Sequence, residues 1–147
     1  MDMINKKDLE LINEFTIKMD KKINKIADQS EDLSDGFKSL TDKEGQTLCL
    51  IGYKNSLTMG ELANLLGVSY GTPTVTIDRL VEKNFVKRIP DKEDRRKVLV
   101  TLTGKGEKIY DEMTEIRLNY LGSIYEKLSE DEVIMLRKIL KMITSKI

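Results

Sequence analysis

Residues 91–97 read DKEDRRK, and the six residues after them, 98–103, read VLVTLT. The charged segment separates two short β-prone runs, Phe85 to Ile89 and Lys97 to Leu102, and this pattern predicts a tight β-hairpin. Pro90 can help close the first strand because it lacks a ladder donor, and the acidic residues favour a turn. A two-stranded ribbon that carries Arg95 and Arg96 at its tip suits a groove in DNA.

The segment before the hairpin is predicted to form two short helices joined by a glycine turn. Thr58, with a glutamate three residues later, has the pattern of a helix-capping box, and Gly67 suits the end of that helix. Ser69 or Thr72 begins the next helix, which Asn84 ends. A helix, a turn, a second helix and a basic hairpin, in that order, are typical of a winged helix-turn-helix.

A long amphipathic helix is predicted before this segment. Residues 4–27 carry one apolar stripe, with side chains in steps of three and four at Ile12, Phe15, Met19, Ile23 and Ile26. Residues 31–38 are polar and are interpreted as a loop. Thr41 and Glu44 then have the spacing of another capping box, which predicts a helix that runs to about Gly52 and buries Leu48 and Ile51.

Two more helices are predicted after the hairpin: Thr103 begins a long one, and Ser129 with Glu132 caps the last. The predicted fold class is therefore mainly α with a small β-hairpin, in a single domain over residues 1–147. It comprises a winged-helix lobe at 40–103 and dimerisation helices at 1–30 and 104–147. The apolar faces of these terminal helices exceed what a small winged helix needs, so we expect a second copy to cover them. The alternative is that they fold back on their own core.

The composition limits the class of protein. With 147 residues, 39% of them apolar, the chain can bury a core without a disulfide, and the single Cys49 fits a reducing cytoplasm. No apolar run approaches the roughly 18 residues of a membrane span and no signal-peptide core is found, so we expect a cytoplasmic protein with no membrane partner. The chain has no His, no glycine-rich phosphate loop and no metal-ligand cluster. We therefore predict no enzyme, no cofactor and no metal site.

The net charge is zero, but the charges are unevenly distributed. Residues 78–109 hold ten Lys and Arg against six Asp and Glu, whereas residues 1–35 hold six against nine. Positive charge is thus concentrated on the second short helix and the hairpin, and only local charge acts at a phosphate backbone. A charged segment can also be an ordinary solvated face, so this distribution supports DNA binding without establishing it.

Together these residues resemble the MarR (multiple antibiotic resistance regulator) family of bacterial transcription regulators over about residues 40–146. The matching landmarks are TMGELA at 58–63, LGVS at 66–69, IDRL at 77–80, KNFVKR at 83–88, DxxDRR at 91–96 and VLVTLTxxG at 98–106. The wing sequence, at this spacing from IDRL, is the most specific of them. The resemblance implies a homodimer that binds double-stranded DNA at a pseudo-palindromic operator, as a repressor that a small-molecule effector releases.

The resemblance also places candidate DNA contacts. The helix from Tyr70 to Lys83 would lie in a major groove, and the hairpin tip would reach an adjacent minor groove. The candidate DNA-binding residues are Ser69, Tyr70, Gly71, Thr72, Thr74, Val75, Asp78, Arg79, Lys92, Arg95, Arg96 and Lys97. Thr72 and Thr74 can hydrogen-bond phosphates or base edges. Val75 or Tyr70 can touch a thymine methyl group.

In the wing, Arg96 is expected to enter a narrow, A·T-rich minor groove, and the neighbouring cations to contact phosphates. Asp94 is expected to hold the wing in shape by pairing with Arg79, or simply to cap the turn. Many members of the family have an arginine, the usual reader of guanine, where this chain has Val75. We therefore expect an A·T-rich operator that is read partly through its shape. The wing arginines could instead be ordinary solvated turn residues.

Further residues have two interpretations each. Met19, Tyr110 and Met113 could line a small-molecule cleft of the kind the family often has, or could be core residues, which we favour. Cys49 is interpreted as a buried small apolar residue, with a redox-sensing regulator as the alternative. A function of another class is a winged-helix protein-interaction module that docks an acidic partner. DNA binding that is sequence-specific and falls steeply with salt distinguishes the two.

Overall fold

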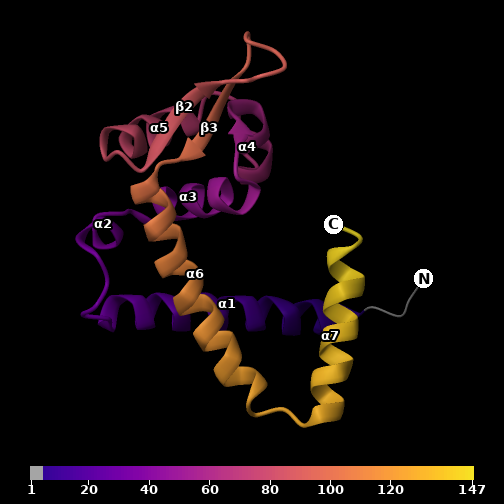
Figure 1. Cartoon of the computed structure of the whole chain (residues 1–147). Helices are drawn as coiled ribbons and strands as arrows, with labels where there is room; N and C mark the ends of the chain where they lie inside the picture. The colour runs from indigo at the N-terminus through magenta and orange to yellow at the C-terminus, as the bar shows by residue number, and fades with distance from the viewer. Residues whose placement is uncertain (1–4) are drawn as a thin grey trace. The chain divides into compact units, whose positions relative to one another are not determined.

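The structure is a computed structural model that describes residues 5–147, so Ile4, the first residue of the predicted N-terminal helix, lies outside the described part. The described residues are mainly helical with a small antiparallel sheet, as predicted (Figure 1). The helices are α1 (Lys6–Gln29), α2 (Asp35–Lys38), α3 (Asp42–Lys54), α4 (Met59–Leu66), α5 (Pro73–Glu82), α6 (Gly104–Tyr125) and α7 (Glu130–Thr144). The strands are β1 (Leu57–Thr58), β2 (Val86–Pro90) and β3 (Val98–Leu102).

The chain divides into two compact units. One is Ser30–Thr114, which holds the sheet and α2 to α5, and we call it the winged-helix unit. The other is Met1–Gln29 together with Glu115–Ile147, which we call the helical unit. The boundary passes through α6, so the first part of that helix belongs to the winged-helix unit.

The predicted hairpin is present in the winged-helix unit. β2 and β3 pair antiparallel from Val86 opposite Leu102 to Pro90 opposite Val98. β1 adds a third strand on the other edge of β3, because Leu57 pairs with Val100. This strand was not predicted, since two residues are too short to show the alternation that identifies a strand. Figure 1 shows α4 and α5 beside the sheet.

The core of this unit lies between α3, α4, α5 and the sheet. Leu48 and Ile51 are fully buried, as predicted. The other buried members of the cluster are Leu57, Leu62, Ile77, Leu80, Phe85, Val86, Val100, Leu102 and Ile109. Burying a large aliphatic side chain contributes about 1.5–3 kcal/mol. Because α5 contributes two of these side chains and β2 and β3 contribute three, the cluster fixes the helix against the sheet.

The predicted helix ends are largely confirmed. Capping boxes begin α3 at Thr41, α4 at Thr58 and α7 at Ser129, each with a glutamate three residues later. Gly67 ends α4 with φ 65°, a left-handed conformation that glycine adopts at little cost. The segment 31–38, interpreted from its polarity as a loop, contains the short helix α2. Ser34 caps α2, and its hydroxyl donates to the Glu112 carboxylate of α6 at 2.7 Å. Because Glu112 is distant in the sequence, no local pattern predicts this contact.

The start of α6 is joined closely to the start of the hairpin. Thr103 donates its amide to the Phe85 carbonyl at 3.0 Å and its hydroxyl to the Asn84 carbonyl at 2.6 Å. The same hydroxyl accepts from the Gly106 amide at 3.1 Å, so Thr103 caps α6 as predicted. A Cβ atom at Gly106 would overlap the Phe85 carbonyl oxygen. Glycine at residue 106 therefore lets α6 approach the backbone of residue 85.

A buried ion pair attaches the end of α5 to α3. Glu44 is 2% exposed, and its carboxylate accepts from Lys83 Nζ at 2.7 Å and from the Thr41 amide at 2.8 Å. Burial alone would raise the pKa of Glu44, but these hydrogen bonds and the lysine charge outweigh it and hold the pKa below its ordinary 4.5. Lys83 also donates to the Ser39 carbonyl at 2.7 Å. The last turn of α5 is thus positioned by contacts outside its own helix.

We expect Glu44→Gln to destabilise the fold by about 1–2 kcal/mol at pH 7, because it removes the charge while glutamine can still complete the capping box. The folded-state pKa of Glu44 is lowered, so the carboxylate's contribution is complete above pH 4.5 and disappears as the pH falls through that lowered value. Urea unfolding at pH 7 and pH 3 should show the variant and the parent converging at the acidic pH. Glu126→Gln, which changes an exposed glutamate, is the control. A difference that is independent of pH would contradict this role.

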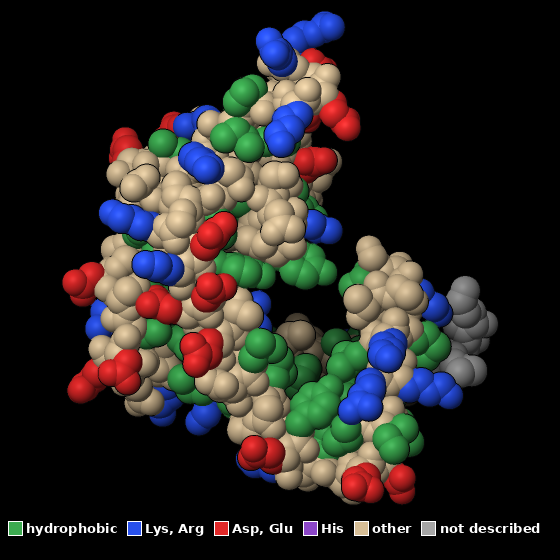
Figure 2. Space-filling view, viewed as in Figure 1, with side chains coloured by type: hydrophobic (Ala, Val, Ile, Leu, Met, Phe, Trp, Pro, Cys, Tyr) green, Lys and Arg blue, Asp and Glu red, His purple; other side chains and the backbone are tan. Residues whose placement is uncertain are grey.

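The helical unit carries many apolar side chains at its surface. No residue of α1 or α7 is buried. The large apolar residues exposed on these helices are Leu9, Leu11, Ile12, Phe15, Ile17, Ile134, Met135, Ile139, Leu140, Met142 and Ile143. Figure 2 shows apolar side chains gathered over the C-terminal helices. None of the described helices has the length and hydropathy needed to cross a membrane.

Candidate nucleic-acid interface

The predicted groove-facing side of α5 is the side opposite the core. Pro73, Ile77 and Leu80 are buried against the unit. The helix therefore presents the remaining side to solvent, where Thr74, Val75, Asp78 and Arg79 are all exposed. Val75 is 59% exposed, a large fraction for an isopropyl side chain. An exposed row of short side chains lets a helix lie close to base edges.

Of the two starts predicted for this helix, the structure has Thr72, which precedes the first helical residue Pro73. The longer helix from Tyr70 that the resemblance implied is not present, because residues 70–72 form a turn. Thr72 makes no capping hydrogen bond, and its hydroxyl lies 2.6 Å from that of Ser69 instead. Proline at residue 73 fixes the first helical φ without needing a capping partner. Tyr70 and Gly71 thus precede the helix rather than belong to it.

Tyr70 is exposed beside the start of α4. The residue is 70% exposed, and its ring lies 3.4 Å from the position that a Cβ atom would take at Gly60, an ordinary van der Waals distance. The exposed ring remains accessible to a partner of the unit.

Asp78, predicted as a groove-facing residue, is paired. Its Oδ1 lies 2.5 Å from Arg88 Nη2, so an arginine of β2 binds a carboxylate of α5. Arg88 was missed by sequence reasoning, because no local spacing connects a strand residue to a helix residue ten positions earlier. The pair reduces the negative charge that α5 would present to phosphates. It also links α5 to the wing.

The wing tip is shaped by two aspartates. Asp91 accepts the Glu93 amide at 2.8 Å, and Asp94 accepts the Arg96 amide at 3.1 Å, so both cap the turn through their side chains. The predicted pairing of Asp94 with Arg79 is wrong. The cation near Asp94 is Arg96, with Nε 3.7 Å from Oδ1. Arg96 belongs to the same turn as Asp94 and reaches it without any tertiary contact, whereas a pair with Arg79 would require the wing to approach α5.

The basic side chains of the wing project from its tip. The side chain of Arg96 is 96% exposed, and Lys92, Arg95 and Lys97 are exposed as well. Figure 2 shows Lys and Arg side chains gathered at the tip of the β2–β3 hairpin. Their long, solvated side chains can rearrange onto phosphates at little cost, because only the weak contact of Arg96 with Asp94 must be broken.

Two of the three candidate effector residues lie in the winged-helix unit. Tyr110 and Met113 are partly buried and pack against the core cluster, as favoured from the sequence. Met19 belongs to α1 in the helical unit. Cys49 is half-buried, and its Sγ lies 3.7 Å from Met113 Sδ. Cys49 was predicted to be a buried small apolar residue; it lies beside a methionine but is only half-buried.

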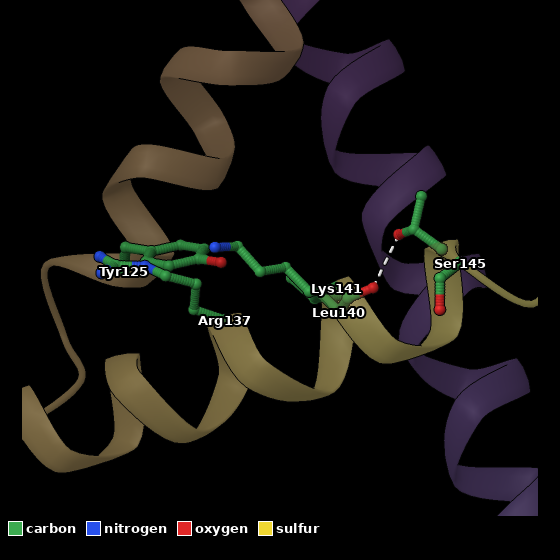
Figure 3. A pocket seen from close by; sticks show the side chains of 6 residues that line it. Tyr125, Arg137, Leu140, Lys141 and Ser145 are labelled. Carbon is green, nitrogen blue, oxygen red and sulfur yellow. Dashed lines mark hydrogen bonds between the residues drawn. The ribbon is translucent and has the colours of Figure 1, made fainter.

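A pocket of about 480 Å³ lies in the helical unit, and none of the predicted site residues lines it (Figure 3). It is lined by Tyr125, Arg137, Leu140, Lys141, Thr144 and Ser145. In Figure 3 the side chains of Arg137 and Lys141 extend toward Tyr125. The Thr144 hydroxyl donates to the Leu140 carbonyl at 2.7 Å. The lining residues of α7 are exposed, so the pocket is a surface hollow. Within residues 5–147, no three His, Cys, Asp or Glu side chains gather into a group that could hold a metal ion.

Known proteins share both this sequence and this arrangement. The MarR family model matches residues 40–98. The multiple antibiotic resistance protein MarR of Escherichia coli is 30% identical over 142 residues, which cover 96% of this chain and 85% of that protein. The chain belongs to the MarR family.

Solved structures of MarR-type proteins agree with this assignment. Streptococcus pneumoniae FabT in complex with DNA has a TM-score of 0.72 and 27% identity, covering 94% of this chain and 96% of its own. A MarR family protein from Bacillus stearothermophilus has a TM-score of 0.78 at 22% identity over 97% of both chains, which shows the shared fold. As a MarR family member, this protein is a DNA-binding transcriptional regulator with a winged helix-turn-helix fold.

Proposed function

We propose that this MarR family regulator is a homodimeric repressor that binds an A·T-rich, pseudo-palindromic operator and is released by a small-molecule effector in the cytoplasm. The observation that carries the proposal is the common exposure of two elements in one unit. The outer side of α5 and the cationic tip of the β2–β3 hairpin both face solvent. The ion pair between Arg88 Nη2 of β2 and Asp78 Oδ1 of α5, at 2.5 Å, connects the helix to the hairpin. A helix and a hairpin connected in this way can enter adjacent grooves of one DNA duplex.

The proposal of a homodimer rests on the helical unit. Its exposed apolar side chains include Leu11, Ile12 and Phe15 on α1, each more than half exposed. Exposed apolar side chains in such number are rare on a monomer, and an identical surface on a second copy can cover them. A two-fold dimer would present two α5 helices and two wings. The natural target is then a site with two half-sites about 34 Å apart.

The proposal of an A·T-rich operator rests on the chemistry of α5. Its exposed residues near the start are threonines and Val75, which can touch thymine methyl groups and hydrogen-bond phosphates. With Asp78 bound to Arg88, the exposed side of α5 offers only Arg79 as a free-standing cation for guanine. Arg96 at the wing tip would add preference for a narrow minor groove.

Release by an effector would act through the spacing of the two DNA-binding elements. A small molecule that binds better to a dimer with another spacing weakens DNA binding by the ratio of its two affinities. Oxidation of Cys49 is the alternative trigger. Oxidation would enlarge the sulfur group that lies beside Met113 of α6 and would disturb this contact.

Selection of binding sites from random duplex DNA tests the proposal. We expect a pseudo-palindrome rich in A·T pairs. Affinity should fall steeply with salt, with a slope of log K against log salt of about −5 if Lys92, Arg95 and Lys97 of both copies neutralise phosphates. An operator with essential guanines opposite α5 would contradict the proposed readout. Failure to bind any duplex, with retention of an acidic protein, would favour a protein-interaction module instead.

A further inference from the structure

A half-open pocket of about 270 Å³ lies within the winged-helix unit, where the ends of α3 and β3 meet the first turns of α6. It is separate from the exposed side of α5 and from the wing tip, because none of the residues there line it. The side chains with chemistry to offer are Asn55, Thr101, Glu107, Tyr110 and Asp111. Tyr110 alone among them was singled out from the sequence.

The pocket is negatively charged. Glu107 and Asp111 are four residues apart on α6, so they lie on the same side of the helix, and both line the pocket. No Lys or Arg lines it, and the five ion pairs among the described residues include neither carboxylate. The nearby Glu112 differs, because Ser34 occupies its carboxylate. Two exposed carboxylate residues therefore line this hollow, and no Lys or Arg lines it with them.

Tyr110, which lies between Glu107 and Asp111 in the sequence, packs its ring against α3. A Cβ atom at Gly52 would overlap the ring of Tyr110, so the ring lies directly on the backbone of α3. Glycine inside a helix costs about 1 kcal/mol relative to alanine, and here it admits the ring. The wall opposite is also fixed, because Thr101 donates its hydroxyl to the Asn55 carbonyl at 2.8 Å. The pocket is thus shaped before any ligand enters.

We propose that this pocket binds a small organic cation, a primary ammonium group on a compact apolar body. The ammonium can donate to Glu107 and Asp111 and be attracted by the ring of Tyr110. An anion would meet two like charges. A metal ion is disfavoured, because the pocket brings together only two carboxylates and the described residues hold no group of three His, Cys, Asp or Glu side chains. The proposal rests on the proposed response to a small molecule, but the site lies in one unit, so its binding can be measured without DNA or a second copy.

Titration of the ¹⁵N-labelled full chain with benzylammonium chloride tests the site, followed by ¹H–¹⁵N correlation spectra. We expect saturable shifts at millimolar concentration for the amides of Asn55, Thr101 and the first turns of α6. Benzyl alcohol carries the same ring without charge, and benzoate carries the opposite charge. Both should leave these amides nearly unmoved. Equal shifts with benzoate, or shifts confined to other parts of the chain, would overturn the proposal.

The variant Glu107→Gln/Asp111→Asn separates the charges from the shape of the pocket. Its affinity for benzylammonium should fall roughly tenfold or more, because two charge-assisted contacts are lost. Glu126→Gln, which removes an exposed carboxylate outside the pocket, should bind as the parent does. Both changed residues are exposed, so the fold should persist, and circular dichroism checks it. The single change Asp111→Asn gives the same readout if the double variant does not fold. Unchanged affinity in either variant would overturn the assignment.

Discussion

Arg96→Ala is expected to lower the affinity of the protein for its operator by roughly 30-fold or more, while the dimer remains intact. Arg96 has 96% of its side chain exposed at the wing tip, so its removal should cost no packing in the free protein. Each specific arginine contact to DNA contributes about 1–3 kcal/mol. A dimer loses two of them, and at least about 2 kcal/mol corresponds to the stated loss of affinity.

Gel-shift titration on the selected operator, together with light scattering, measures both quantities. Arg117→Ala is the matched control, because it removes the same exposed charge from α6 within the helical unit. We expect the control to bind DNA nearly as the parent does. An Arg96→Ala protein with parental DNA affinity would remove the wing from the proposed mechanism. A loss of the dimer in this variant would also contradict it, since the wing lies outside the helical unit.

Gly106→Ala is expected to destabilise the winged-helix unit by about 3 kcal/mol or more. The added methyl would overlap the Phe85 carbonyl oxygen, which is a backbone atom and cannot move away by changing a rotamer. That carbonyl also accepts the Thr103 amide at 3.0 Å, so moving it would break the junction between the hairpin and α6. The added methyl group would therefore clash with the Phe85 carbonyl and would also weaken its hydrogen bond with the Thr103 amide.

Gly104→Ala provides a control within the same turn. A Cβ atom at Gly104 would meet nothing within 4 Å. Alanine there should leave the stability unchanged or raise it by up to about 1 kcal/mol, because it restricts the unfolded chain. Urea unfolding of both variants gives the comparison. Equal stability of the two would mean that α6 does not approach residue 85 as closely as described.

The features predicted well from the sequence are those that depend on neighbours along the chain. The capping boxes at Thr41, Thr58 and Ser129 involve residues three apart, and all three are present. The hairpin follows from two β-prone runs around a charged turn, and its pairing extends over the expected residues. The exposure of Val75 and the burial of Ile77 follow from the period of one helix.

The errors arose where a distant residue, or the geometry of a turn, determined the result. Asp94 was assigned to Arg79, but its own turn places Arg96 within reach. The partner of Asp78, Arg88 of β2, was not predicted, because the pair forms only when α5 packs beside the sheet. The helix that the resemblance placed from Tyr70 starts at Pro73, the later of the two starts predicted from the sequence, because proline favours the first helical position.

Local patterning along the chain thus accounts for the longer helices, for most of their starting residues and for the side of each that faces water, since these depend on residues within about four positions. The short α2 is the exception, because its cap Ser34 is bound by Glu112 of α6. The partners of charged and aromatic side chains depend on folding. Lys83 reaches Glu44 across 39 positions, and Thr101 reaches Asn55 across 46. Such pairs form only after the apolar core has brought α3, α5 and β3 together. Their energies, and the pocket that Glu107 and Asp111 line, are therefore properties of the packed molecule.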